Sequence, residues 1–248
     1  MTHTQQPRPG AQTIYSADGE ILFLGQWEPK SLFRAVTGDN EDYWRGKRVL
    51  DIGANTFGLS IELARAGAEV VAIEPDPHHW IKNLILEIVK DVISREHLQL
   101  ITHEAGLWEA KQFGTFDTVL CLGLVYHFRD QQFVIDWLST LEMVDLIISN
   151  QTHPGNQLAV VNRMDSSMPF RPDFWDAYEE PLSGWHPTHP MFVRMLQFAG
   201  FDNVTPLTDP AVNFPEKPLP GVTNSAYYRA TKQLTVDPIA SRFRYHPR

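Results

Sequence analysis

Residues 49–76 read VLDIGANTFGLSIELARAGAEVVAIEPD and contain the elements of a strand–turn–helix–strand unit. The apolar run Val49–Ile52 ends at a glycine turn, and Leu59–Ala66 then places apolar residues on one face of a helix. A second strand follows at Glu69–Ile73, which is rich in β-branched residues. A unit of this length predicts two parallel strands joined by a right-handed helical crossover.

The turn of this unit predicts a ligand site. Gly53 and Gly58 bracket the turn, and Glu74 follows the second strand. Ligands of such sheets bind at the carboxyl ends of the strands, beside the first turn. Because both glycines lack side chains, we expect a ligand to lie directly on the turn and on the amino end of the helix. An acid about 20 residues after the glycines can accept hydrogen bonds from two ribose hydroxyls.

The residues within the turn favour a cationic ligand over a dinucleotide. A dinucleotide turn has a glycine at the middle position of G-x-G-x-x-G, where the pyrophosphate approaches the backbone. This chain has Asn55 there, and Asp51 would place an anion beside the pyrophosphate. An acid at the end of this strand suits an amine instead. The alternative is an ordinary α/β unit whose glycine turn is structural.

The pattern D-I-G-A-N-x-x-G followed by V-x-A-I-E-P-D resembles the first two motifs of the class I S-adenosylmethionine-dependent methyltransferases. The resemblance implies S-adenosylmethionine as cofactor. It implies an α/β, Rossmann-like, seven-stranded, mainly parallel sheet with helices on both faces, an N-terminal cap and a lid insertion after strand five. The implied cofactor-binding residues are Asp51, Gly53, Asn55, Gly58, Glu74, Asp76, Glu104, Leu122 and Gly123. Within this set Glu74 would bind the ribose, Asp51 the methionine amine and Glu104 the adenine amino group. For Glu104, a solvated acid at a strand end stays an open alternative.

Length and charge set limits on domains and partners. A chain of 248 residues predicts one domain with additions: a tail and cap at 1–45, the methyltransferase domain at 46–234 with the lid insertion at about 154–189, and a C-terminal tail at 235–248. The net charge of -9, from 30 acidic and 21 basic residues, argues against a nucleic-acid partner. One cysteine and the lack of an apolar run near 18 residues favour a cytoplasmic protein without a membrane segment.

A second informative stretch, LGLVYHF at residues 122–128, follows the predicted fourth strand, 116–123. The carboxyl end of this strand lies beside the reactive group of the cofactor. We therefore expect Tyr126 and His127 to be catalytic, with His127 as the general base because its ordinary pKa suits proton transfer. The alternative is a histidine that caps the next helix or hydrogen-bonds the backbone. No cluster of oxygen ligands at the strand ends predicts a magnesium site.

Between the fifth strand, 144–149, and the helix at 191–199 lies a long segment of weak periodicity, typical of a lid or a binding loop. Its aromatic and charged residues predict a walled pocket for a small molecule, and a self-packed loop is the alternative. The candidate substrate-binding residues are His153, Arg163, Trp185 and Thr188. His153, His186 and His189 lack the cysteine or carboxylate that would complete a metal site, so we expect none.

The remaining elements follow from local patterns. The first twelve residues are expected to be disordered, and a hairpin is expected at 13–25. A helical segment at 27–42 is either an apolar cap or a lid in which Tyr15, Trp27 and Lys30 touch the ligand. Further helices are expected at 78–92 and 131–142, and further strands at 98–102, 201–207 and 225–232, the last entering antiparallel at the edge of the sheet.

The phrases GKRVLDIG and VLCLGLVYH, and W-x-P-T followed by FVRMLQFAGF, resemble a methyltransferase subgroup related to the tRNA-wobble-uridine carboxymethyltransferase family, over roughly residues 21–205. The sequence thus predicts an S-adenosylmethionine-dependent methyltransferase that modifies oxygen, nitrogen or carbon of a small molecule. Transfer to tRNA and a non-enzymatic, cofactor-binding partner protein are the alternatives. A homodimer is a further expectation. The short basic C-terminal tail is either a solvated end or a contact to a neighbouring subunit.

Overall fold

A computed structural model describes residues 6–38, 40–77, 81–153, 156–162, 185–207 and 225–232. The chain forms two compact units. The first comprises Met1–Leu120 with Val212–Pro215, and the second comprises Cys121–Ala211 with Glu216–Arg248. The turn and acid singled out above lie in the first unit, and Tyr126 and His127 lie in the second.

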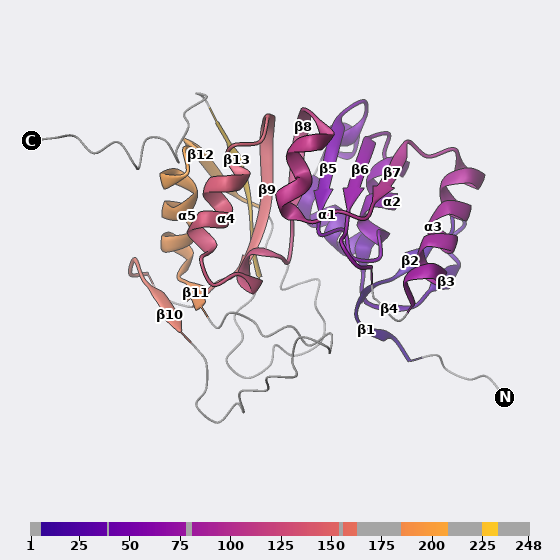
Figure 1. The fold of residues 1–248 in the computed structure, drawn as a ribbon, viewed down its shortest axis with the longest axis horizontal. Coiled ribbons are helices and arrows are strands. Elements are labelled where there is room, and N and C mark those ends of the chain that lie inside the picture. Colours follow the sequence, from indigo (N-terminus) through magenta and orange to yellow (C-terminus); the bar gives the residue numbers. More distant parts are fainter. Residues whose placement is uncertain are drawn as a thin grey trace, which may run out of the picture. The chain divides into compact units, whose positions relative to one another are not determined.

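The first unit contains the predicted strand–helix–strand unit (Figure 1). Its strands are β1 (Arg8–Gln12), β2 (Ile14–Tyr15), β3 (Ile21–Phe23), β4 (Gly25–Trp27), β5 (Arg48–Ile52), β6 (Glu69–Ile73), β7 (Leu100–His103) and β8 (Phe116–Cys121). Its helices are α1 (Pro29–Thr37), α2 (Gly58–Arg65) and α3 (Lys82–Glu96), with short 3-10 helices η1 (Glu41–Trp44) and η3 (Leu107–Phe113).

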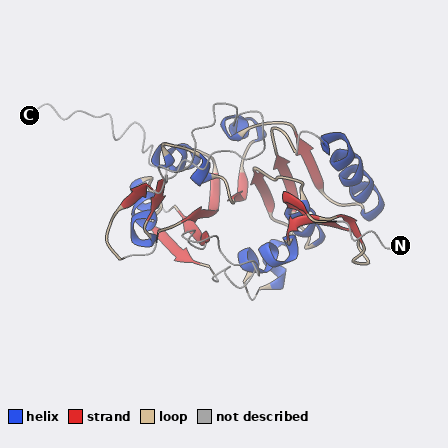
Figure 2. Cartoon of the chain, turned by 90° about the horizontal axis from the view of Figure 1, so that it is seen from below, coloured by secondary structure: helices blue, strands red, loops and turns tan. Residues whose placement is uncertain are grey.

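The sheet of the first unit has the order β8-β5-β6-β7, and β5 pairs in parallel with β6, as β6 does with β7. The crossover between β5 and β6 is α2, so the parallel unit predicted for residues 49–76 is confirmed. Strands β5 and β6 are mostly apolar, and all their residues except the first of each, Arg48 and Glu69, are buried, as expected for a parallel sheet. Figure 2 shows helices in blue beside the red strands of this unit.

The N-terminal segment departs from the sequence prediction. Disorder was expected up to Gln12, but Arg8–Gln12 forms strand β1, which pairs in parallel with β4. The predicted hairpin is confirmed, because β2 and β3 pair antiparallel. The sequence of β1, RPGAQ, has no clear period of apolar residues, so local patterns did not predict this strand. Its partners are β4 and the glycine turn after β5.

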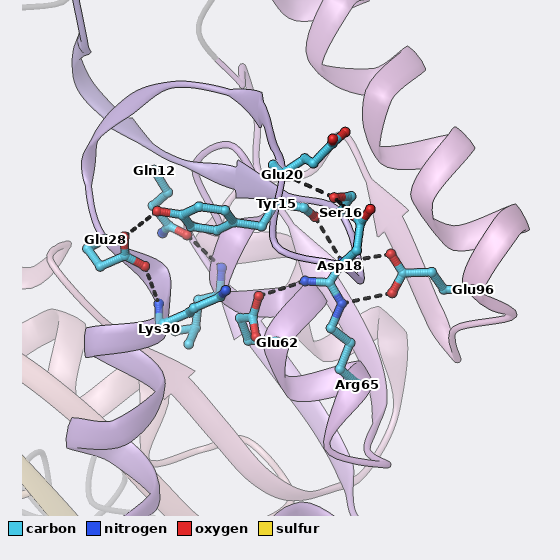
Figure 3. A network of polar contacts seen from close by, with 11 residues as sticks. Gln12, Tyr15, Ser16, Asp18, Glu20, Glu28, Lys30, Glu62, Arg65 and Glu96 are labelled. Atoms are coloured by element: carbon cyan, nitrogen blue, oxygen red, sulfur yellow. Dashed lines mark hydrogen bonds and ion pairs between the residues drawn. The ribbon is translucent and has the colours of Figure 1, made fainter.

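Charged side chains fasten this N-terminal segment to the helices of the first unit (Figure 3). Arg65, at the end of α2, donates Nε and Nη2 to the two carboxylate oxygens of Glu96, at 2.8 and 2.7 Å, and Nη2 also donates to the Tyr15 carbonyl at 2.9 Å. The Tyr15 hydroxyl donates to Glu28 at 2.5 Å. Burial and the neighbouring carboxylate of Glu28 raise the pKa of Tyr15 to about 12, so its hydroxyl keeps its proton.

Helix α3 begins at Lys82 and ends at Glu96, four residues beyond the predicted end at 92. His97 closes it in the left-handed conformation, with a φ of 53°, and its N–H donates to the Ile93 carbonyl. The extra turn brings Glu96 within reach of Arg65.

The second unit contains η4 (Val125–His127), α4 (Gln131–Leu138), β9 (Met143–Gln151), β10 (Val160–Asn162), β11 (Trp185–Pro187), α5 (His189–Phe198), β12 (Asn203–Pro206) and β13 (Ser225–Thr231). The predicted helices at 131–142 and 191–199 are confirmed with slightly different bounds. Strands β10 and β11 pair antiparallel around the insertion. Residues 154–155, 163–184 and 233–248, and with them most of the predicted lid and the predicted tail, lie outside the described residues.

Strand β13 is antiparallel as predicted, but it is not the edge strand. It pairs with β9 on one side and β12 on the other, and both pairings are antiparallel. Its Tyr228 and Ala230 are fully buried, whereas Asn203 and Thr205 of β12 are exposed. An edge strand can also hold Pro206, which has no N–H to give to a ladder.

The central sheet contains seven strands, as predicted, and it is mixed because β13 runs against its neighbours. Among the described residues, none of the helices has the length and apolarity needed to cross a membrane.

Candidate functional site

The turn after β5 is held against β6 by backbone hydrogen bonds. The N–H groups of Gly53 and Ala54 both donate to the Ile73 carbonyl, at 2.9 and 3.1 Å. Gly53 has a φ of 71°, and two non-glycine residues also have left-handed backbone, Asn55 with a φ of 59° and Phe57 with a φ of 65°. Non-glycine residues rarely adopt this conformation. The turn is therefore strained, and contacts from outside it must hold its shape.

Glu74 lies next to this turn, as its spacing predicted. Its carboxylate accepts from the N–H of Asn55 at 3.0 Å through one oxygen and from the N–H of Asp76 at 3.1 Å through the other. The residue is half-buried. A carboxylate oxygen accepts more than one hydrogen bond, so these bonds are compatible with ribose hydroxyls as further donors. The acid fits the ribose part of the implied cofactor.

Asp51 is the buried acid at the end of β5. It is 3% exposed, and one of its carboxylate oxygens accepts from the Ser60 hydroxyl at 2.6 Å. Burial raises the pKa of Asp51 to about 6, although the Ser60 hydrogen bond acts in the opposite direction. A buried carboxylate of this kind is stabilised by a cation placed close to it. This chemistry fits the methionine amine that the sequence assigned to Asp51.

Gly58 lies against the N-terminal segment. A Cβ at this position would lie 2.5 Å from the Thr13 carbonyl oxygen and 3.2 Å from Cβ of Gln12. The position that a Cβ of Gly58 would occupy is thus filled by the N-terminal segment, and the cofactor contact predicted for Gly58 stays a prediction. The side chain of Asn55 is likewise directed to β1, since its Nδ2 donates to the Gly10 carbonyl at 2.9 Å.

Two further candidates lie at the ends of β6 and β7. Asp76 gives its backbone N–H to Glu74. Glu104 has a 63% exposed side chain that forms an ion pair with Lys82, at 2.6 Å between Nζ and Oε1. The adenine contact assigned to Glu104 and the solvated alternative both stay open predictions.

The candidate catalytic residues lie in the second unit, after β8. Leu122 and Gly123 are partly exposed, and the N–H of Gly123 donates to the Ser149 hydroxyl at 2.8 Å. Gly123 has a φ of 65°, and a Cβ there would lie 3.4 Å from the Tyr126 hydroxyl. The rings of Tyr126 and His127 are 4.4 Å apart, and the N–H of His127 donates to the Leu124 carbonyl. The two predicted residues are therefore neighbours in η4, with Tyr126 buried and His127 half-buried.

Sequence reasoning missed the partners of this group. Tyr227 of β13 faces Ser149 of β9 in the strand register and hydrogen-bonds to it. Burial, followed by the nearby Tyr126, raises the pKa of Tyr227, so its phenol stays protonated. Ser149 thus joins the backbone of Gly123 to the Tyr227 side chain. No local pattern signals this pair, because the two residues are far apart in the chain.

Of the substrate candidates, His153 and Thr188 form a parallel bridge, and the N–H of His153 donates to the Pro187 carbonyl at 2.8 Å. Thr188 is fully buried, its N–H donates to the Ala159 carbonyl at 2.8 Å, and its hydroxyl donates to the Gln157 carbonyl. It precedes α5 without making a side-chain cap. Trp185 belongs to β11, and Arg163 lies outside the described residues.

The second unit also contains a cavity of about 640 Å³ that the sequence did not single out. Side chains from the start of α4, from β10 and from one side of α5 line it. They are Arg129, Asp130, Gln131, Gln132, Val160, Met191, Met195 and Phe198. Its volume lies within the range of small-molecule pockets. Across the described ranges, no group of three or more His, Cys, Asp or Glu residues is arranged to hold a metal ion.

No protein-family model matches the sequence. A stretch of 119 residues, 47% of this chain, is 31% identical to the magnesium-protoporphyrin O-methyltransferase of Rhodobacter capsulatus and covers 50% of that protein. The matching region thus spans about half the length of the curated relative.

Solved structures resemble a larger part of the chain. The N-terminal domain of EvdMO1, solved in the presence of S-adenosylhomocysteine and D-fucose, has a TM-score of 0.57 at 17% identity, with 92% of each chain covered. The magnesium protoporphyrin IX methyltransferase from Synechocystis PCC 6803, with bound S-adenosylmethionine, has a TM-score of 0.53 at 19% identity and covers 83% of this chain and 78% of its own. At these identities the likeness concerns the fold, which is the α/β fold of class I methyltransferases.

Proposed function

We propose that this protein is an S-adenosylmethionine-dependent methyltransferase that acts on a small molecule. The single observation that carries the proposal is the contact between Glu74 and the N–H of Asn55, at 3.0 Å, in a methyltransferase fold. This hydrogen bond joins the acid after β6 to the turn after the neighbouring strand, β5. When bound, the cofactor supplies an electrophilic methyl group on a sulfonium.

The residues that would hold the cofactor are those whose chemistry fits its parts. Glu74 would accept the ribose hydroxyls, and Asp51 would pair with the methionine ammonium group. Gly53 would let the methionine part approach the turn, and Glu104 would accept from the adenine amino group. Leu122 and Gly123, which are partly exposed, are further candidates for contact with the cofactor.

His127 would accept the proton of an oxygen or nitrogen acceptor. Holding the acceptor at near-attack distance would supply most of the acceleration, on the order of 7 kcal/mol or more. The relative from Rhodobacter capsulatus is named a magnesium-protoporphyrin O-methyltransferase, which supports an acceptor of small-molecule size. The acidic net charge of -9 disfavours tRNA as the acceptor.

Calorimetric titration with S-adenosylhomocysteine tests the cofactor site. We expect Glu74→Gln to weaken binding by at least tenfold. The glutamine amide has only one acceptor oxygen, whereas the two ribose hydroxyls would donate to both oxygens of the Glu74 carboxylate. Glu87→Gln, an exposed glutamate of α3, is the matched control and should bind as the wild type does. Equal affinity of the wild type and Glu74→Gln would reject the ribose assignment.

An acceptor screen with radiolabelled S-adenosylmethionine then separates the three functional readings. Transfer to small molecules supports the proposal. A salt-sensitive shift of total tRNA, with labelled tRNA, would favour the wobble-uridine alternative. Tight cofactor binding without transfer to any acceptor would favour the non-enzymatic partner protein.

A further inference from the structure

The start of α2 lacks a cap from its own residues. Phe57 stands at the N-cap position with left-handed backbone and makes no side-chain cap hydrogen bond. The first N–H groups of a helix have no partner within the helix. A cap must therefore come from elsewhere in the chain, and here it comes from the N-terminal strand.

Gln12 supplies this cap from β1. Its Oε1 accepts from the N–H of Leu59 at 2.7 Å, over a separation of 47 residues in the chain. The residue is 7% exposed, so this bond is sheltered from water. The contact replaces the local N-cap that Ser, Thr or Asp would normally provide.

The backbone of Gln12 grips the turn as well. Its N–H donates to Asn55 Oδ1 and to Thr56 Oγ1, both at 3.0 Å. Its carbonyl accepts from the Thr56 hydroxyl at 2.7 Å. One residue thus satisfies three polar groups of the turn and of the helix behind it.

The hydrogen bonds of β1 to the turn are linked, through Asn55, to the carboxylate of Glu74. The side chain of Asn55 hydrogen-bonds to β1, and its backbone N–H donates to Glu74. Asn55 and Phe57 both have left-handed backbone, which an isolated turn would not keep. The hydrogen bonds from β1 to Asn55 and Thr56 therefore fix the position of the Asn55 N–H, which in turn donates to Glu74.

We propose that Gln12 is a positioning residue for the cofactor: by capping α2 and gripping the turn, it holds the turn and Glu74 in the binding-competent arrangement. Gln12 acts through these groups and needs no contact with the cofactor. The inference rests on the proposed function, since it concerns the same site.

The test compares substitutions that remove or keep the acceptor at position 12. Gln12→Leu has similar volume and no acceptor, whereas Gln12→Glu keeps an oxygen at the same reach. We expect Gln12→Leu to raise the Kd of S-adenosylhomocysteine five- to twentyfold and Gln12→Glu to stay within threefold of the wild type. Thr56→Val, with Thr56→Ser as its matched control, tests the backbone grip in the same way.

Amide hydrogen exchange by NMR gives a readout that needs no ligand. Leu59 N–H depends on Gln12, while the neighbouring Ile61 N–H bonds within the chain to the Phe57 carbonyl at 3.0 Å. In Gln12→Leu, exchange at Leu59 should quicken by at least tenfold relative to Ile61. A purely global loss of stability would quicken both amides together. If Gln12→Leu does not fold, the Thr56 pair carries the test.

The outcomes separate the two proposals. A wild type that fails to bind S-adenosylhomocysteine defeats the proposed function, while the exchange data still report on the cap. Faster Leu59 exchange with unchanged affinity in Gln12→Leu or Thr56→Val overturns the positioning role. Equal loss of affinity in Gln12→Glu and Gln12→Leu overturns it too, because the acceptor would then be irrelevant.

Discussion

Asp51→Asn should stabilise the fold at neutral pH and weaken the cofactor site at the same time. Asp51 is 3% exposed, and burial raises its pKa from the ordinary 3.8 to about 6. A shift of this size corresponds to about 3 kcal/mol between the two protonation states. Asparagine has nearly the same shape and no charge, so at pH 8 the variant avoids that cost.

The sign follows from proton linkage. The folded state binds the Asp51 proton more tightly than the unfolded state does, because the folded pKa is raised. This group therefore destabilises the wild type fully above about pH 6, and its cost is lost as the pH falls from about 6 towards 3.8. The advantage of Asp51→Asn should reach up to about 3 kcal/mol at pH 8, or about 6–12 °C in Tm, and should shrink towards pH 4.5.

Urea denaturation of wild type and variant at pH 8, 6 and 4.5 measures this difference, in which the titration of other groups largely cancels. Ser60→Ala is the informative control. Its hydroxyl donates to Asp51 at 2.6 Å and lowers the pKa of that carboxyl, so its removal should destabilise the protein most at pH 8. An Asp51→Asn variant no more stable than the wild type at pH 8 would refute the reasoning, as would an advantage independent of pH.

Two further predictions concern the turn and the candidate base. Gly58→Ala should lose about 1–3 kcal/mol of stability in denaturant titration, because its Cβ would lie 2.5 Å from the Thr13 carbonyl, while Gly106→Ala, whose Cβ finds its nearest neighbour at 3.8 Å, should be nearly neutral. Equal stability of the two variants would show that β1 moves away from the turn at little cost. His127→Gln should slow transfer to an oxygen or nitrogen acceptor by about 10²- to 10⁴-fold in single-turnover assays, with unchanged affinity for S-adenosylhomocysteine. A normal rate would remove the base role.

Local sequence patterns predicted the strand–helix–strand unit and the acid that follows it. The strands on either side of α2 are continuous apolar runs, and their spacing alone implies a parallel pair with its ligand edge at the turn. Glu74 lies beside that turn because it follows the second strand directly. No more than the repeat of apolar residues and the position of one acid was needed for that inference.

Contacts within each unit that the sequence did not predict join residues far apart in the chain, and no periodic pattern signals them. Gln12 meets Leu59 over 47 residues, and Tyr227 meets Ser149 because β13 inserts beside β9. The position of β13 between β9 and β12 also explains why its prediction as the edge strand was wrong, since an antiparallel strand can pair between two other strands as well as at an edge. The contact between Gly58 and the N-terminal segment was not predicted for a related reason: a glycine signals a close approach without indicating whether a ligand or the chain itself approaches.

Asn55 explains why this turn depends on the N-terminal strand. It stands where a dinucleotide turn has its middle glycine, and its φ of 59° is a conformation that glycine adopts freely and asparagine tolerates better than most residues. A glycine there would leave the turn flexible and its surface open. Asparagine restricts the turn and adds an amide side chain, which binds Gly10 and Gln12 of β1. The asparagine that argues against a pyrophosphate thus also provides the attachment point for β1. The N-terminal segment therefore holds the turn at which we propose that the cofactor binds.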